Sequence, residues 1–292
     1  MEQYLESRCE QLDVRGLRYN VRHWGNPAAP RVFFLHGWMD ASATFQFVVD
    51  ALEREWHVIA PDWRGYGATE WLGKPYWFPD YYADLDAVLA HYSPHGPARL
   101  VGHSMGANIA SIYAAARPER VSQVAMLDFL GLPASHADEA PGQLRKWLDA
   151  LIDTPSMRAY PDADAFARRL LQVNPRLTPA RAASLAGHIV HRRDDGQIGM
   201  AADPWHKVRS PLPYRIDEAM ACWRAIEAPV LMLIVDRGYV HERFGDQPDE
   251  LQRRLDCFAT ARVVPIGDAG HNVQHDQPEQ VAAALEAFLL RD

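Results

Sequence analysis

The stretch Gly102-His103-Ser104-Met105-Gly106 determines how this 292-residue chain is interpreted. It follows a short apolar run at 98–101 and precedes an alanine- and isoleucine-rich run at 107–116 that predicts a helix. Ser104 is therefore expected at a strand-to-helix turn, where flanking glycines remove side chains that would collide. The pattern is typical of a nucleophile elbow, although a glycine-bounded turn whose serine only caps a helix gives the same letters.

Composition favours one compact α/β domain with an insertion. The formal net charge is −8 and the positive residues are scattered, which argues against a nucleic-acid partner. The three cysteines, Cys9, Cys222 and Cys257, are far apart and show no C-x-x-C spacing. This pattern argues against a disulfide framework and a zinc site, and it favours a reducing compartment.

Two further features concern location. The N-terminal residues 1–6 lack a basic segment followed by an apolar stretch. No run approaches the ~18 consecutive apolar residues that a membrane span requires. We therefore expect a cytoplasmic protein without a membrane partner.

Apolar runs rich in valine, leucine and isoleucine alternate with helical patterns along most of the chain. This alternation predicts a mostly parallel, doubly wound sheet that is covered by helices on both faces. Strands are predicted at 31–35, 57–60, 98–102, 121–127, 229–235 and 261–266, and helices at 80–92, 107–116 and 278–290.

The alternation stops between residues 129 and 222, where helical patterns at 142–152, 162–173 and 179–190 follow one another without clear strands. We interpret 129–222 as a helical cap inserted between core segments 1–128 and 223–292. The cap carries many large apolar side chains, most of which are expected to pack it onto the sheet. A few should line a pocket beneath it.

Four short motifs in the chain resemble the landmarks of the α/β-hydrolase family, in the same order and at the ends of predicted strands. They are His36-Gly37, Asp62-x-x-Gly65-x-Gly67, the elbow at Ser104 and Gly270-His271. The resemblance covers nearly the whole chain outside the insertion and implies the α/β-hydrolase fold. Residues 36–40 (His-Gly-Trp-Met-Asp) and 211–215 (Pro-Leu-Pro-Tyr-Arg) are similar to the serine-hydrolase-like branch, whose members have a helical cap.

A serine hydroxyl needs a histidine to accept its proton and an acid to orient that histidine. The resemblance implies that His271 is this base, because residues 268–272 follow the last strand and precede the last helix, as the family's histidine loop does. His103 lies within the elbow itself. We expect its side chain to point away from Ser104 and interpret it as a packing residue.

The resemblance also implies an oxyanion hole made by the backbone N–H groups of Trp38 and Met105. Met105 lies at the first turn of the helix that starts at the elbow, where the helix dipole favours an anion. The indole of Trp38 is a candidate wall of the acyl pocket. Trp147 and Trp205 of the cap are further candidates for substrate contacts.

The triad acid departs from the family's usual pattern. Most members carry it in a Gly-x-x-Asp-like turn after the strand that corresponds to 229–235, but here that position is Gly238. Some branches place the acid after the preceding core strand, which in this chain ends in Asp128. We prefer Asp128 and keep Asp236 as the alternative acid, since both preserve the chain order Ser, Asp, His.

These features predict a serine hydrolase that cleaves a carboxylic ester of a small to medium, largely apolar molecule through an acyl-enzyme. A serine in the elbow argues against epoxide hydrolases and haloalkane dehalogenases, whose nucleophile in this fold is a carboxylate. The mechanism needs no metal and no organic cofactor. Lactone, amide or carbon-carbon bond hydrolysis and peracid formation remain alternatives, as does a non-catalytic ligand-binding homologue.

Overall fold

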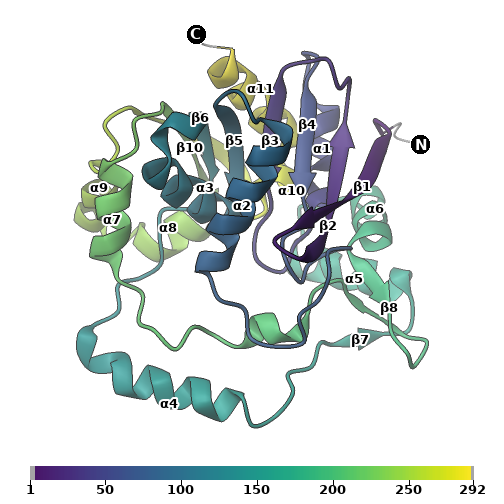
Figure 1. The fold of residues 1–292 in the computed structure, drawn as a ribbon. Coiled ribbons are helices and arrows are strands. Elements are labelled where there is room, and N and C mark those ends of the chain that lie inside the picture. Colours follow the sequence, from purple (N-terminus) through teal and green to yellow (C-terminus); the bar gives the residue numbers. More distant parts are fainter. Residues whose placement is uncertain (1–3, 291–292) are drawn as a thin grey trace.

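The computed structural model describes residues 4–290, which form an eight-stranded sheet with helices on both faces (Figure 1). Residues 1–3 and 291–292, part of the two predicted core segments, lie outside the described residues. The strand order is β1-β2-β4-β3-β5-β6-β10-β11. The strands are β1 (Ser7–Val14), β2 (Leu17–Trp24), β3 (Arg31–Leu35), β4 (His57–Pro61), β5 (Ala98–His103), β6 (Val121–Leu127), β10 (Val230–Arg237) and β11 (Ala261–Gly270).

The predicted mostly parallel sheet is confirmed. All pairings from β4 to β11 across the sheet are parallel, whereas β1 pairs antiparallel with β2, and β2 with β4. The β1–β2 hairpin is absent from the predicted strands because β1 is largely exposed and polar and so lacks a buried apolar run. Its turn is Arg15-Gly16, and both residues have positive φ, as a tight two-residue hairpin requires.

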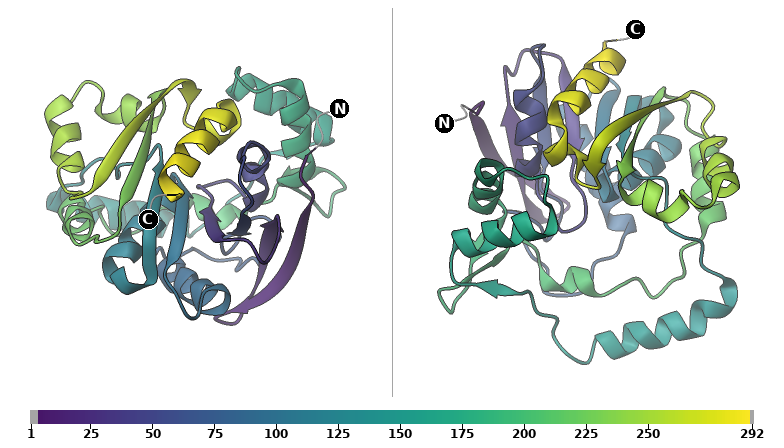
Figure 2. Two further views of the ribbon diagram at one scale, coloured as in Figure 1. Left: turned by 90° about the horizontal axis from the view of Figure 1, so that it is seen from above. Right: turned by 180° about the vertical axis from the view of Figure 1, so that it is seen from behind.

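The helices of the core lie in two layers. One face of the sheet packs against α2, α3, α7 and α8, and the other packs against α1, α10 and α11 (Figures 1 and 2). The core helices are α1 (Gln46–Asp50), α2 (Pro79–Tyr92), α3 (Met105–Ala116), α7 (Ile216–Arg224), α8 (Tyr239–Phe244), α9 (Pro248–Leu255), α10 (Val273–Asp276) and α11 (Pro278–Leu289), with short 3₁₀ turns η1 (Ser42–Phe45) and η2 (Pro118–Arg120).

The segment between β6 and α7 is not purely helical, so the expectation of an insertion without strands is wrong. It contains a three-stranded antiparallel sheet in the order β7-β9-β8. These strands are two or three residues long, too short to show an alternating pattern, and residue 190 begins a strand instead of ending a helix. The segment comprises η3 (Ala137–Glu139), α4 (Ala140–Ala150), β7 (Ala159–Tyr160), α5 (Ala163–Val173), α6 (Pro179–His188), β8 (Val190–Arg192), β9 (Ile198–Met200) and η4 (Pro204–Lys207).

The two parts of this segment pack differently. Helices α5 and α6 share an apolar cluster with the core, in which Phe166 and Leu185 join Ala41 and Phe47. Helix α4, which continues directly from η3, has no buried residue, and chain without regular secondary structure leads into η3 and away from α4 (Figures 1 and 2). Burial therefore fixes α5 and α6 far more strongly than α4.

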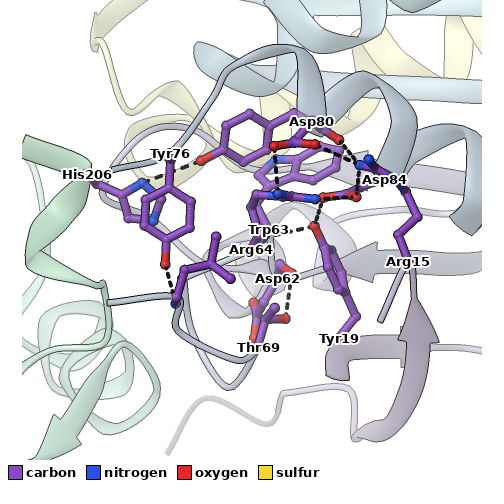
Figure 3. A network of polar contacts seen from close by, with 12 residues as sticks. Arg15, Tyr19, Asp62, Trp63, Arg64, Thr69, Tyr76, Asp80, Asp84 and His206 are labelled. Atoms are coloured by element: carbon purple, nitrogen blue, oxygen red, sulfur yellow. Dashed lines mark hydrogen bonds and ion pairs between the residues drawn. The ribbon is translucent and has the colours of Figure 1, made fainter. Parts of the chain in front are cut away.

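A buried ion pair holds the loop that follows β4 (Figure 3). The guanidinium of Arg64 makes two hydrogen bonds to Asp84 of α2, at 2.6 and 2.7 Å, and a further ion pair with Asp80 at 3.0 Å. Arg15 and the Tyr19 hydroxyl also bind Asp84, whose side chain is fully buried. These bonds fix the position of the loop relative to α2. The loop in turn binds the inserted segment, because Gly67 N–H donates to the carbonyl of residue 201 and the Gly65 carbonyl accepts from the N–H of residue 203.

Asp84→Ala should lower the free energy of unfolding by about 3 kcal/mol or more, because Arg64 then keeps a buried charge without its main partner. Urea denaturation measures the loss. Asp86→Ala is the matched control on the same helix, since the Asp86 side chain is 47% exposed, and its cost should be about 1 kcal/mol or less. Equal losses in the two variants would contradict the role given to the buried pair.

Candidate active site

Ser104 stands at the tip of the turn between β5 and α3. Its backbone is strained, with φ of 51° and ψ of −114°, in a region that non-glycine residues rarely adopt. A Cβ on Gly102 would lie 2.4 Å from backbone atoms of Gly106, and a Cβ on Gly106 would lie 2.0 Å from the Leu35 carbonyl oxygen. The two glycines are therefore required by the close approach of β5, α3 and the end of β3.

The structure brings Ser104, His271 and Asp128 together, although they are far apart in the chain. Ser104 Oγ lies 2.9 Å from His271 Nε2, and His271 Nδ1 lies 2.8 Å from Asp128 Oδ2. A carboxylate only accepts hydrogen bonds, so His271 carries its proton on Nδ1 and directs a lone pair on Nε2 toward the serine hydroxyl. The His271 side chain is 37% exposed, so solvent reaches the imidazole that faces Ser104.

Asp128 is held as an acceptor on all sides. It follows β6 directly, has a positive φ of 47°, and its side chain is fully buried. Besides the bond to His271, its carboxylate accepts backbone N–H bonds from Tyr239 at 2.6 Å and Val240 at 3.4 Å. These amides open α8 and have no partner within that helix. The buried carboxylate is thus satisfied and oriented toward the imidazole.

Gly238 lies at the family's usual position for the acid, and the space around it has no room for a side chain. A Cβ on Gly238 would lie 2.2 Å from Asp128 Oδ2 and 2.0 Å from Val235 Cγ2. The space beside His271 can hold a side chain from residue 128 or from residue 238, but not from both.

Asp236, the alternative acid, has no hydrogen bond or ion pair with the His271 ring in the described part of the chain. Its exposed carboxylate accepts the backbone N–H groups of Asp268 at 3.1 Å and Ala269 at 3.0 Å. The hydrogen bond from Ala269, reinforced by the one from Asp268, lowers the pKa of Asp236 below its ordinary value. Asp236 therefore braces the loop that leads to His271.

The His36-Gly37-Trp38 loop lies directly against Ser104. A Cβ on Gly37 would lie 2.9 Å from His103 Nδ1 and 3.3 Å from Ser104 Cβ, so a glycine lets the loop lie here without displacing these side chains. His36 fixes the loop, because its Nδ1–H donates to the Gly37 carbonyl at 2.8 Å and its Nε2 accepts from Trp63 N at 2.8 Å. Burial lowers the pKa of His36 to about 4, which keeps the ring neutral for this double role.

Of the two predicted oxyanion donors, Met105 directly follows the serine and Trp38 directly follows Gly37. Met105 is the first residue of α3 and Trp38 belongs to the His36-Gly37-Trp38 loop. Neither backbone N–H donates a hydrogen bond to a protein acceptor within residues 4–290. Both are thus available to an anion that forms next to Ser104 Oγ.

The three candidate substrate-binding tryptophans lie on different parts of the structure. The Trp38 side chain is 55% exposed, and its indole N–H donates to the His206 carbonyl at 3.4 Å, which links the loop to η4. Trp205 precedes His206 in η4, and Trp147 lies on α4; both are half-buried.

Among residues 4–290, no group of three or more His, Cys, Asp or Glu side chains is arranged to hold a metal ion.

Comparison with known proteins places this architecture in a family. The model of the α/β-hydrolase fold family matches residues 30–278. The chain belongs to the α/β-hydrolase family. A serine hydrolase-like protein of Danio rerio is 29% identical over 277 residues, which cover 91% of this chain and 83% of that protein. The predicted resemblance of this α/β hydrolase to the serine-hydrolase-like branch is confirmed.

Two other relatives carry names that describe acyl chemistry. Lipase LipV of Mycobacterium tuberculosis is 28% identical over 282 residues, which cover 92% of this α/β hydrolase and 97% of the lipase. The solved structure of a thioesterase domain from the curacin biosynthetic pathway has a TM-score of 0.85 at 26% identity, over 97% of this chain and 99% of that domain.

No helix among residues 4–290 has the length and hydrophobicity to cross a membrane.

Gly238→Ala should lower the free energy of unfolding by about 1–3 kcal/mol and displace the Asp128 carboxylate from His271, because the added methyl group overpacks this site. Thermal denaturation and a crystal structure of the variant measure the two effects. Gly142→Ala, in α4 with nothing within 4 Å of the new Cβ, should leave the stability unchanged or raise it by up to about 1 kcal/mol. A stable Gly238→Ala with an undisplaced Asp128 would contradict the steric argument.

Proposed function

We propose that this α/β hydrolase is a serine hydrolase that cleaves a carboxylic ester of a small to medium, largely apolar substrate through an acyl-enzyme intermediate. The observation that carries the proposal is the continuous chain of hydrogen bonds from Ser104 Oγ through both ring nitrogens of His271 to Asp128. Each partner has the chemistry its place requires: a hydroxyl, an imidazole with a free lone pair, and a buried carboxylate.

In the first step, His271 Nε2 accepts the proton of Ser104 Oγ while the oxygen attacks the ester carbonyl carbon. The imidazolium that forms is stabilised by Asp128, which also keeps the proton of the neutral ring on Nδ1. The alcohol then leaves with the proton from Nε2. In the second step, the same nitrogen takes a proton from a water molecule that attacks the acyl carbon. It then returns this proton to Ser104 Oγ as the bond between the acyl carbon and Oγ breaks and the acid is released.

The negative oxygen of each tetrahedral intermediate is bound by the backbone N–H groups of Trp38 and Met105. Support comes from two observations: neither N–H group has an acceptor among the residues that the structure describes, and Met105 lies at the N-terminus of the 12-residue helix α3, whose dipole favours negative charge. The Gly37 contact with Ser104 keeps the first donor within reach of the reacting carbon.

The part of residues 129–222 that precedes the core helix α7 forms the cap that shapes the substrate site. Trp38, Trp147 and Trp205 are the proposed contacts for the apolar part of the substrate. Exposed apolar side chains, including Leu144 and Leu148 of α4, support an apolar ligand because they add hydrophobic surface to the cap.

Ester hydrolysis is also supported by the similarity to a lipase and to a thioesterase domain, since both names describe the transfer of an acyl group to water. The same site can act on a thioester without any change of residue roles. Parallel assays with a p-nitrophenyl ester and an acyl thioester of equal chain length decide which leaving group is preferred.

Ser104→Ala should lower kcat for p-nitrophenyl acetate by about 10⁴-fold or more, because the nucleophile is lost while the fold is kept. A fluorophosphonate probe should label the wild type at Ser104 and leave the variant unlabelled, as mass spectrometry of the tryptic peptide will show. If the wild type binds an ester without turnover and resists the probe, the protein is a non-catalytic ligand-binding homologue.

Asp128→Asn should lower kcat by about 10⁴-fold, because an amide at this position favours the wrong tautomer of His271. Asp236→Asn, its matched control on the neighbouring strand, should stay within about tenfold of the wild type, since the amide oxygen still accepts a backbone hydrogen bond. Steady-state kinetics on the same ester measure both. A larger loss in Asp236→Asn would assign the acid to Asp236.

A further inference from the structure

His103 is a buried imidazole beside the reacting groups that the mechanism above does not use. It immediately precedes Ser104, and its side chain is 3% exposed. Its Nε2 lies 2.8 Å from the main-chain carbonyl oxygen of His271, and the centroids of the two imidazole rings are 4.8 Å apart. A carbonyl oxygen only accepts, so Nε2 of His103 carries a proton and donates it.

The other ring nitrogen of His103 fixes this tautomer. The side-chain amide of Gln274, which is fully buried in α10, donates to His103 Nδ1 at 3.3 Å. Burial, reinforced by the neighbouring His271, lowers the pKa of His103 well below its ordinary value, so the ring is neutral. A neutral ring that accepts at Nδ1 must donate at Nε2, which is the bond to His271.

Asp40 lies on the same side of the ring. Its Oδ2 is 3.9 Å from His103 Nδ1, while its Oδ1 accepts the Ala41 N–H at 2.9 Å. Burial raises the pKa of Asp40 to about 7, although the bond from Ala41 opposes the shift. A carboxyl group that is partly protonated near neutral pH can face the lone pair of Nδ1 with less repulsion than a fixed anion.

The same ring also contacts the oxyanion loop, since a Cβ on Gly37 would lie 2.9 Å from His103 Nδ1. His103 is therefore packed between the loop that bears one proposed oxyanion donor and the loop that bears the proposed base. Two consecutive residues therefore form hydrogen bonds with His271: Ser104 with its side chain and His103 with its main chain.

We propose that His103 is a positioning residue, which fixes the main chain of His271 so that the imidazole lies on the line between Ser104 and Asp128. This inference rests on the proposed serine-hydrolase function. Without the Nε2–H donor, the His271 carbonyl loses its partner and the loop loses one of the contacts that define its place. A small displacement of the base slows proton transfer but leaves the surfaces that bind the substrate in place.

The test compares His103→Leu, which removes the donor, with His103→Gln, whose amide N–H can replace it. His103→Leu should lower kcat for p-nitrophenyl acetate by about 10- to 100-fold and leave KM within about threefold of the wild type. His103→Gln should recover kcat to within about fivefold. The control His57→Leu removes another buried histidine, at the opposite end of the strands, and should lower the melting temperature without changing kcat.

The inference is overturned if His103→Leu keeps the wild-type kcat, or if His103→Gln restores nothing. Should His103→Leu not fold, Gln274→Leu decides, because it removes only the bond that selects the tautomer. A fall in kcat of about three- to tenfold supports the inference, and an unchanged kcat overturns it. The rate of fluorophosphonate labelling separates the two proposals: an unlabelled wild type refutes the hydrolase, whereas equal labelling rates in wild type and His103→Leu refute only the positioning role.

Discussion

The Asp128 carboxylate occupies the space that a side chain at residue 238 would need, and the geometry of the site depends on this exclusion. The missing Cβ at Gly238 leaves room for a carboxylate that reaches His271 at 2.8 Å. In the same place the carboxylate accepts the first amides of α8, so the start of that helix and the orientation of the His271 ring are fixed by one group. A side chain at 238 would disturb both.

The strand order explains how an acid at the end of β6 can serve a histidine that follows β11. Strand β10 lies between them, and neighbouring strands are about 4.8 Å apart, so Asp128 must reach across the end of β10. The Asp128 N–H bonds to Leu233 of β10 at 2.8 Å, and the positive φ of Asp128 then turns the chain. The crossing passes over Gly238, where β10 has just ended. An acid on β10 itself would need no such crossing.

The sequence predicts well those features that local constraints impose. The elbow glycines, the apolar core strands and the positions of Ser104 and His271 follow from motifs at the ends of buried strands, where the chain must turn at a definite residue. The choice between Asp128 and Asp236 does not follow from a motif, because both lie near the end of a strand and precede His271 in the chain. The missed elements depend on tertiary contacts. The polar strand β1 exists through its ladder to β2, and the small sheet of the cap is too short to leave a pattern. The hydrogen bond of His103 is invisible in the sequence because its partner is a main-chain carbonyl 168 residues away.

The two parts of the inserted segment are linked unequally to the loop that carries His271. Asp276 accepts the N–H of Gly270 with one oxygen, at 2.8 Å, and the amide of Asn174 with the other, at 2.6 Å, so the α5–α6 turn is tied to the residue before His271. Arg176 pairs with Asp268 in the same loop at 3.3 Å. Helix α4 buries no residue, so a displacement of α4 removes little apolar contact from the core and does not act on these bonds. The placement of α4 and the position of the His271 loop are therefore physically separable in this structure.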